Sequence, residues 1–259
     1  MTSQKIKVDH LSKSFGSKVV LDELSIDVIE GESLVIIGAS GTGKSVLIKT
    51  ILGLIPHDSG DISIDGNNIT NLSQRERQKY MRKFGMLFQG GALFDSLPVW
   101  QNIAFTLIQG TSTHGRRFNK NEAKAIATET LRAVNLSSDV ADRYPGELSG
   151  GMQKRVALAR AIAGQPEIIF FDEPTTGLDP ITSSTINHLI RENVKDRGIT
   201  SVAITHDMGS VRSIADRVAL LHDGQIMWQG PVGELDQTEN PYVHQFIHGL
   251  REGPMKIVY

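Results

Sequence analysis

One stretch near the start of the chain decides its fold: Gly38-Ala39-Ser40-Gly41-Thr42-Gly43-Lys44-Ser45. It fits the phosphate-binding pattern G-x-x-x-x-G-K-[ST] at every position. The apolar segment Leu34–Ile37 precedes it and a segment of helical character follows, which is the strand–loop–helix context that this pattern requires. Glycine lets consecutive N–H groups approach a phosphate closely, and the N-terminus of the following helix adds partial positive charge. A glycine-rich turn with an incidental lysine is the weaker interpretation.

The predicted ligands of this loop are a nucleotide and Mg²⁺, and the loop alone fits kinases, GTPases and many motors. We expect the Lys44 ammonium to bridge the β- and γ-phosphates, and the Ser45 hydroxyl to be a ligand of Mg²⁺.

Two carboxylates follow a short apolar run later in the chain. Ile168–Phe171 has the composition of a fully buried parallel strand, and Asp172 and Glu173 come directly after it. Such strands deliver their carboxyl ends to the ligand crevice. Asp172 is therefore predicted to hold Mg²⁺, and Glu173 to polarise the attacking water as a general base. The alternative is a helix-capping Asp172 beside a surface Glu173, although Pro174 argues against a helix that begins here in the ordinary way.

Bulk composition excludes several classes of function. The 259 residues suffice for one large α/β domain with an embedded subdomain, or for two small domains. A formal charge of −2 gives no electrostatic footprint for nucleic acid, and the absence of cysteine excludes disulfides and thiolate metal sites. The first residues have no apolar signal region, and no apolar run reaches the roughly 18 residues that span a bilayer. The sequence predicts a protein that works on the water side of any membrane it serves.

The order of predicted elements indicates a mostly parallel core sheet with a helical insertion. The expected strands are Ile6–Leu11, Leu24–Ile29, Leu34–Ile37, Asp61–Ile64, Ile168–Phe171, Ser201–Ile204, Val218–Leu221 and Gln225–Trp228. The expected helices are Lys44–Leu54, Pro98–Leu107, Asn121–Val134, Ser149–Ala163, Thr182–Val194 and Met208–Ala215. Hairpins are expected at Asp65-Gly66 and Asp223-Gly224, and the basic stretch Arg75–Lys83 is expected to be a solvated helix face.

The C-terminal segment carries an apolar stripe of Tyr242, Phe246 and Leu250 at helical spacing. We expect Gly253-Pro254 to end that helix and to leave Met255–Tyr259 as an apolar tail. Packing of this tail on its own domain and packing on a neighbouring subunit both remain open.

The segment Leu148-Ser149-Gly150-Gly151-Met152-Gln153-Lys154-Arg155 resembles the signature motif of ABC ATPases. In physical terms it is a second anion site, because Ser149 is a good helix N-cap and the two glycines leave the first amides bare toward a phosphate. Met152 stands where the motif usually has glutamine, and this departure leaves the glycines intact. An ordinary capped helix is the alternative.

Other segments are similar to parts of the same family, in the same order. Gln89 resembles the glutamine that senses Mg²⁺ and the γ-phosphate, and Gly177-Leu178-Asp179 resembles the loop that crosses to the partner subunit. His206 resembles the switch histidine that contacts the γ-phosphate, with a polar cap as the alternative. Phe15 resembles the aromatic that stacks on adenine, with core packing as the alternative.

The resemblance implies the fold class: α/β, a RecA-like P-loop core with an antiparallel β subdomain and an inserted α-helical subdomain. The expected boundaries are 1–90 with 160–235 for the nucleotide-binding core, 91–159 for the helical subdomain with the signature motif, and 236–259 for the C-terminal helix and tail. It also implies a head-to-tail homodimer in which each ATP lies between the phosphate loop of one copy and the Ser149 helix of the other.

A free-standing transporter subunit is the class that remains after elimination. Long coiled coils do not fit between Gln89 and Ser149, the chain carries one cassette, and no membrane span is fused to it. The run Gly91–Leu97 and the sequence Phe170-Phe171-Asp172-Glu173-Pro174 resemble the Mla/Mce family of phospholipid transporter ATPases. The alternative is the ATPase of a polar amino-acid importer.

This resemblance implies a peripheral place at the cytoplasmic face of the inner membrane. The implied partners are a multi-spanning permease, an MCE-domain protein and, in some members, a STAS-domain subunit, with no nucleic acid. We expect the permease to dock near Leu93, Phe94 and Phe105, whose apolar side chains are alternatively part of a subdomain core.

Overall fold

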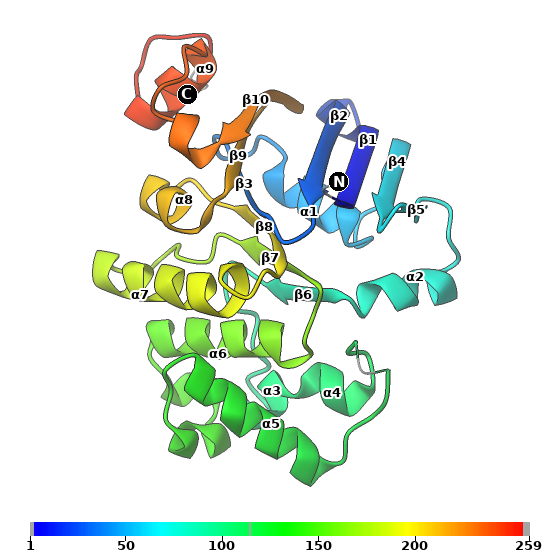
Figure 1. Cartoon of the computed structure of the whole chain (residues 1–259), viewed down its shortest axis with the longest axis vertical. Coiled ribbons are helices and arrows are strands. Elements are labelled where there is room, and N and C mark those ends of the chain that lie inside the picture. The colour runs from blue at the N-terminus through cyan, green and yellow to red at the C-terminus, as the bar shows by residue number, and fades with distance from the viewer. Residues whose placement is uncertain (1–2, 114, 256–259) are drawn as a thin grey trace. The chain divides into compact units, whose positions relative to one another are not determined.

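The computed structural model describes residues 3–113 and 115–255. The chain forms two compact units: Met1–Leu72 with Val202–Tyr259, and Ser73–Ser201. Figure 1 labels the helices and strands of both. In the described part of the chain, no helix has the length and apolar character needed to cross a membrane.

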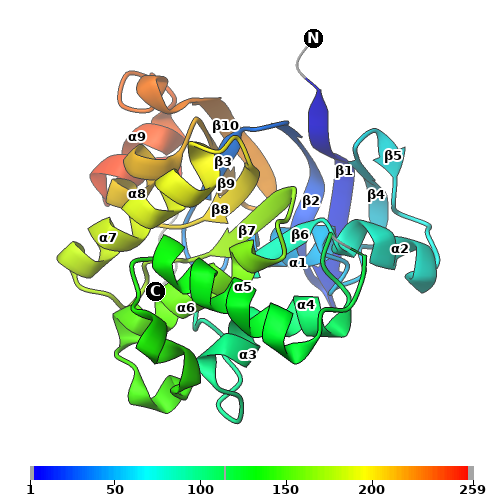
Figure 2. The same ribbon diagram turned by 60° about the horizontal axis from the view of Figure 1, so that its bottom comes forward.

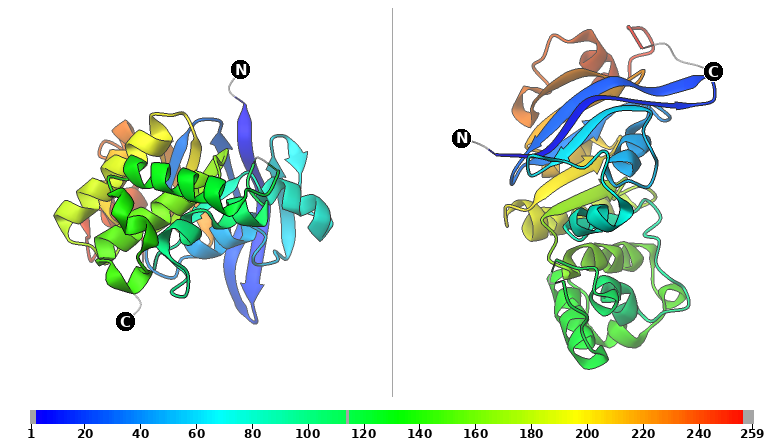
Figure 3. Two further views of the ribbon diagram at one scale, coloured as in Figure 1. Left: turned by 90° about the horizontal axis from the view of Figure 1, so that it is seen from below. Right: turned by 90° about the vertical axis from the view of Figure 1, so that its right-hand side faces the viewer.

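An antiparallel sheet opens the first unit, in the strand order β2-β1-β4-β5. Its strands are β1 (Gln4–Phe15), β2 (Lys18–Ile29), β4 (Ser59–Ile64) and β5 (Asn67–Asn68). The long strands β1 and β2 run side by side in the right-hand view of Figure 3. They extend beyond the predicted segments to the turn at Gly16, because their ladder continues through polar residues as far as the pair Phe15 and Lys18. The predicted hairpin at Asp65-Gly66 is confirmed.

The second sheet of the first unit has the order β10-β9-β3-β8. Its strands are β3 (Ser33–Ile37), β8 (Thr200–Ile204, of which the last three residues belong to this unit), β9 (Arg217–His222) and β10 (Gln225–Pro231). Strand β3 pairs with β9 in parallel, and β9 pairs with β10 in antiparallel fashion. Asp223 and Gly224 both have left-handed backbones, with φ of 46° and 77°, as a two-residue hairpin turn requires.

The described helices of the first unit are α1 (Lys44–Ile51), α8 (Met208–Ile214) and α9 (Pro241–His248). Helix α1 ends three residues before the predicted Leu54. The prediction that Gly253-Pro254 ends the last helix is wrong. Gly249 caps α9 with a left-handed backbone (φ 60°), which is the usual way for a glycine to end a helix, so Leu250 lies outside it.

The second unit contains the parallel pair β6 (Phe84–Leu87) and β7 (Ile168–Asp172) and a set of helices. The helices are α2 (Gln74–Met81), α3 (Val99–Ile103), α4 (Phe105–Gln109), α5 (Lys120–Ala133), α6 (Gly150–Ala163) and α7 (Pro180–Ile190), the last followed by a π-helical turn, Arg191–Lys195. Figures 1 and 2 show α6 between α5 and α7. Within this unit, α6 is therefore the central helix.

The predicted single helix Pro98–Leu107 is wrong, because the chain breaks at Ala104 into α3 and α4. A tertiary contact shapes this region. The Asn102 side chain is fully buried, and it accepts a hydrogen bond from the Phe94 N–H (2.7 Å) and donates to the carbonyls of Phe94 (3.1 Å) and Leu97 (2.9 Å). It therefore fixes the loop before α3.

Replacing this amide with a methyl group is expected to destabilise the loop. Asn102→Ala removes the acceptor of the Phe94 N–H and a donor to the carbonyls of Phe94 and Leu97, at a cost of about 1–3 kcal/mol in the free energy of unfolding. Urea denaturation measures the change, with the neighbouring Gln101→Ala as the matched control. Equal stability of the two variants would contradict the role given to Asn102.

Candidate nucleotide site

The phosphate loop of the first unit connects β3 to α1, and its own lysine shapes it. The Lys44 ammonium, which is buried, donates to the carbonyls of Gly38 (2.8 Å) and Ala39 (2.7 Å). A Cβ at Gly38 would lie 2.3 Å from the Leu221 carbonyl oxygen, so no larger residue fits there. Gly41 has φ +78° with nothing within 4 Å of an added Cβ, so its backbone faces open space. The loop thus has the bare, concave backbone that a phosphate chain needs.

A cavity of 920 Å³ adjoins this loop within the first unit. One wall is formed by Lys18, Val19, Val20 and the loop residues Ala39–Thr42, and the other includes Phe246 and Leu250. This volume falls in the range of small-molecule sites. The loop and cavity therefore fit the predicted ATP.

The C-terminal segment folds back on its own helix in the described residues. Gln245 of α9 is buried; its side chain accepts from the Met255 N–H (2.7 Å) and donates to the carbonyls of Met255 (3.0 Å) and Leu250 (3.3 Å). Of the predicted tail Met255–Tyr259, the part beyond Met255 lies outside the described residues.

The two candidate residues of the first unit outside the loop are both accessible. Phe15, at the end of β1, is 49% exposed, and the Lys13 ammonium lies 5.3 Å from its ring centroid. This exposure excludes core packing. His206 is exposed beyond β8, and Asp207, not His206, caps α8 by accepting from the Gly209 and Ser210 N–H groups (3.1 and 3.0 Å). Both side chains therefore lie at the surface of the first unit.

The acid pair of the second unit ends the fully buried strand β7. Asp172 is 7% exposed, and the next helix begins only at Pro180, so Asp172 is not a helix cap. Glu173 has a left-handed backbone with φ 50°, and its carboxylate accepts from the Thr176 hydroxyl (2.8 Å). A left-handed glutamate is uncommon, and such strain is typical of functional sites.

The Lys154 ammonium of α6 contacts the backbone of the predicted glutamine and interacts electrostatically with the acid pair. Its buried Nζ donates to the Gln89 carbonyl, while the Gln89 residue is exposed. Burial lowers the pKa of Lys154, and the nearby carboxylates of Asp172 and Glu173 oppose this shift. Nothing in the sequence assigned a role to Lys154 beyond its position inside the signature motif. That position is the feature that could have indicated a functional residue.

The signature segment forms the predicted capped helix. The Ser149 hydroxyl accepts from the Met152 N–H (3.3 Å), so the cap uses the backbone of Met152 and does not depend on its side chain. A Cβ at Gly150 would meet nothing within 4 Å, whereas a Cβ at Gly151 would lie 2.8 Å from Thr182 Cγ2. Gly150 thus leaves the helix start open, and Gly151 permits close packing on α7.

Asp179 caps helix α7. Its carboxylate accepts from the N–H groups of Ile181 and Thr182 (3.0 Å each), and these hydrogen bonds lower its pKa together with that from the Thr182 hydroxyl, which contributes most. The residue therefore shapes the loop from Gly177 to α7.

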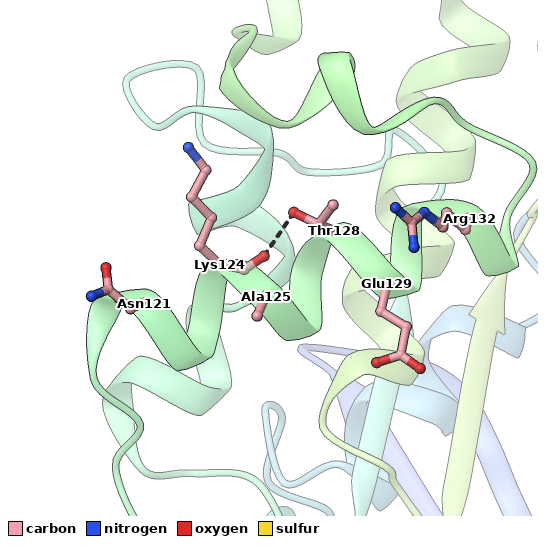
Figure 4. A pocket seen from close by; sticks show the side chains of 6 residues that line it. All are labelled: Asn121, Lys124, Ala125, Thr128, Glu129 and Arg132. Atoms are coloured by element: carbon pink, nitrogen blue, oxygen red, sulfur yellow. Dashed lines mark hydrogen bonds between the residues drawn. The ribbon is translucent and has the colours of Figure 1, made fainter.

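A hollow of 600 Å³ lies on the outer face of α5 (Figure 4). Its lining is Asn121, Lys124, Ala125, Thr128, Glu129 and Arg132. The Thr128 hydroxyl donates to the Lys124 carbonyl (2.8 Å), and the Lys124 ammonium pairs with Asp142 (2.6 Å), so these polar groups have partners within the chain. Among the described residues, no group of three or more His, Cys, Asp or Glu side chains forms a metal cluster.

The family model described as ABC transporter matches residues 21–176, and the chain belongs to this family. Among curated relatives, the intermembrane phospholipid transport system ATP-binding protein MlaF of Haemophilus influenzae is 38% identical over 259 residues, covering 100% of this chain and 96% of that protein. The probable ribonucleotide transport ATP-binding protein mkl of Mycobacterium leprae is 38% identical over 250 residues, covering 96% of this chain and 70% of that protein.

Solved structures agree with this membership. The dimeric ATP-binding cassette MJ0796, bound to ADP and Pi, matches with a TM-score of 0.79 and 31% identity, covering 88% of this chain and 98% of that one. The chain therefore has the ABC ATPase fold, as predicted, and is an ATPase whose hydrolysis is coupled to transport.

Removing the negative charge of Glu173 is expected to separate binding from hydrolysis. Glu173→Gln keeps the shape of the side chain but cannot accept a proton from water, so we expect ATP binding to persist and turnover to fall roughly a hundredfold or more. Phosphate release and a filter-binding assay measure the two quantities, with Glu129→Gln on α5 as the control. Turnover at the wild-type rate would contradict the role of Glu173.

The close approach of Gly151 and Thr182 predicts that a side chain at position 151 clashes with Thr182, and that a smaller residue at position 182 relieves the clash. Gly151→Ala places a methyl group against Thr182 Cγ2, so we expect a loss of about 1–3 kcal/mol in unfolding free energy. Thr182→Ser removes Cγ2 and keeps the hydroxyl that bonds Asp179, so the double variant is expected to recover most of the loss. A double-mutant cycle by thermal denaturation tests this, and strictly additive effects would contradict it.

Proposed function

We propose that this chain is the ATP-hydrolysing subunit of a transporter that moves phospholipid between the inner membrane and an MCE-domain partner in the periplasm. The observation that carries the proposal is the end-to-end match to MlaF, which covers 100% of this chain and 96% of the relative. The match to the mkl relative leaves about a third of that protein unmatched, at 70% coverage. Ribonucleotide transport, which the name of that relative suggests, is the second candidate.

Both units contain residues suited to the nucleotide chemistry. Lys44, held in its loop by two carbonyls, neutralises phosphate charge, and the exposed ring of Phe15 stacks on adenine. Glu173 takes the proton of the attacking water, and the exposed His206 contacts the γ-phosphate.

The proposed Mg²⁺ ligands are the Ser45 hydroxyl, the Gln89 amide oxygen and the Asp172 carboxylate. The donor set fits the ion, because all three supply oxygen, which is the ligand that Mg²⁺ prefers. When bound, Mg²⁺ neutralises the charge that develops on the phosphates. Asp172 is the last residue of a fully buried strand, so the backbone that carries its carboxylate is held in place by the sheet.

A second copy of the chain completes the site in this proposal. Ser149 and Gly150 begin a helix of 14 residues and are exposed, so the positive end of that helix is open to an anion. In the head-to-tail pair the start of this helix meets the γ-phosphate held by the other copy. The loop that leads from Gly177 to the cap residue Asp179 lies beside it in this proposal. The similarity to a dimeric cassette supports this arrangement.

The permease docks, in this proposal, on an apolar groove of the second unit. The groove has a volume of 250 Å³ and is lined by Phe84, Met86, Phe88, Phe94 and Phe105, with Arg82 and Arg160 among the polar residues. Phe94 is 43% exposed, and its ring centroid lies 4.8 Å from that of Phe105. Aromatic side chains exposed in a groove are typical anchors of a protein interface. The chain then lies at the cytoplasmic face of the inner membrane, and a STAS-domain subunit is a further partner in this proposal.

Purification from native membranes tests both the cargo and the groove. The tagged chain, extracted in mild detergent, is expected to bring down a permease, an MCE-domain protein and enriched phospholipid. Phe94→Asp is expected to reduce permease recovery roughly tenfold or more, because a carboxylate cannot occupy an apolar contact. Leu54→Asp is the control, since Leu54 is 61% exposed in the first unit.

The outcomes separate the candidates. Recovery of bound ribonucleotide with a different permease would support the second candidate, and an amino-acid permease with a solute-binding protein would overturn both. Full permease recovery by Phe94→Asp would contradict the docking site and leave the cargo assignment standing.

A further inference from the structure

Two cationic side chains of α6 hold the backbone of the segment Gln89–Ala92. The Lys154 ammonium donates to the Gln89 carbonyl, and the Arg160 guanidinium donates to the carbonyls of Gly91 (2.6 Å) and Ala92 (2.7 Å). Between these contacts, an added Cβ at Gly91 would lie 3.7 Å from Ala157 Cβ, so the segment lies against the surface of α6. We call Lys154 and Arg160 the α6 clamp.

The conformation of the clamped segment needs outside support. Gly91 and Ala92 are consecutive left-handed residues, with φ of 75° and 47°. Alanine seldom adopts this conformation, and such backbones persist only where the surroundings determine them. The Gly91 N–H donates to the Phe88 carbonyl (2.8 Å), which closes the turn from the other side. The planar fork of Arg160 suits two neighbouring carbonyls better than a single ammonium would.

The chemistry of the clamp argues for positioning as its purpose. Lys154 is 7% exposed, and burial of a cation is unfavourable unless hydrogen bonds compensate for lost water. An apolar side chain would fill the same space, but it would not select one orientation of the carbonyls. Directional donors therefore specify which way the segment, and with it the Gln89 side chain, faces.

The clamp also contacts both regions that the transport cycle must connect. Lys154 interacts electrostatically with Asp172 and Glu173, whereas Arg160 lines the groove that contains Phe94 and Phe105. The segment between them carries Gln89 at one end and leads into Phe94 at the other.

We propose that Lys154 and Arg160 are positioning residues for hydrolysis, which fix Gln89 relative to the acid pair and make it move together with the Ser149 helix. This rests on the proposed function, because it takes Gln89 as a ligand of Mg²⁺ and the groove as the permease site. Both side chains donate to backbone carbonyls and neither is a proposed nucleotide contact, so we expect their loss to affect turnover and to leave nucleotide affinity nearly unchanged.

The test is the steady-state kinetics of the transporter purified with Lys154→Met or Arg160→Met in the full chain. We expect kcat to fall roughly ten- to a hundredfold through misplacement of Gln89. The affinity of the isolated subunit for a fluorescent ATP analogue is expected to change less than about twofold, because the two side chains are not expected to contribute to binding of ATP in the ground state. Lys154→Arg should restore most of the turnover. Arg160→Lys should restore only part, because one ammonium does not span two carbonyls as a fork does.

Lys5→Met is the matched control for removal of a buried lysine. Lys5 is 6% exposed and pairs with Asp65 (2.7 Å) in the first unit, whereas both clamp residues belong to the second. Wild-type kcat in both clamp variants, or an equal loss in Lys5→Met, would overturn the inference. So would loss of nucleotide affinity in parallel with kcat. If Lys154→Met does not fold, the half-buried Arg160 carries the test. A wild-type complex without ATPase activity would instead reject the proposed function.

Discussion

Complete burial of the central strands is the constraint on which the placement of the chemistry depends. Every residue of β3, β7 and β8 is buried. A strand covered on both faces has no room for polar groups along its length, so polar groups appear where it ends. Strand β3 runs into Gly38 and the phosphate loop, β7 ends at Asp172, and β8 is followed by His206. Left-handed backbones at Gly41 and Glu173 then turn the chain sharply after two of these ends.

Local signals were sufficient where the responsible residues are neighbours in sequence. The phosphate loop, the Ser149 cap and the Asp223-Gly224 hairpin each rest on a few adjacent residues, and the structure contains all three. The prediction of a single helix over residues 98–107 was wrong. The helix breaks in a region where the Asn102 amide forms hydrogen bonds with the preceding loop, and helical periodicity does not reveal such contacts. The last helix was extended too far because Leu250 fits the apolar stripe, although Gly249 already ends the helix.

The same distinction applies to the candidate site. Asp172 and Glu173 could be predicted because an apolar run points to them, whereas Lys154 and Arg160 resemble the basic residues of any solvated helix. Their partners are backbone carbonyls at Gln89, Gly91 and Ala92, more than sixty positions away in sequence. Carbonyl acceptors leave no trace in the amino-acid letters, because every residue has one. A contact of this kind becomes visible only when the fold brings the two segments together.

The sequence of this chain says less about the transported molecule than about the fold or the nucleotide site, for a physical reason. The motifs at Lys44, Ser149 and Asp172 are predicted to act on ATP, which is the same whatever molecule is moved. Relatives named for phospholipid and for ribonucleotide transport accordingly share the same 38% identity with this chain, and they differ in how far the match extends along the relative. A subunit that handles only ATP influences the cargo through the permease that it accepts. In the proposed assembly, the groove around Phe94 and Phe105, which Arg160 of α6 also lines, is therefore the part of this surface whose side chains bear on specificity.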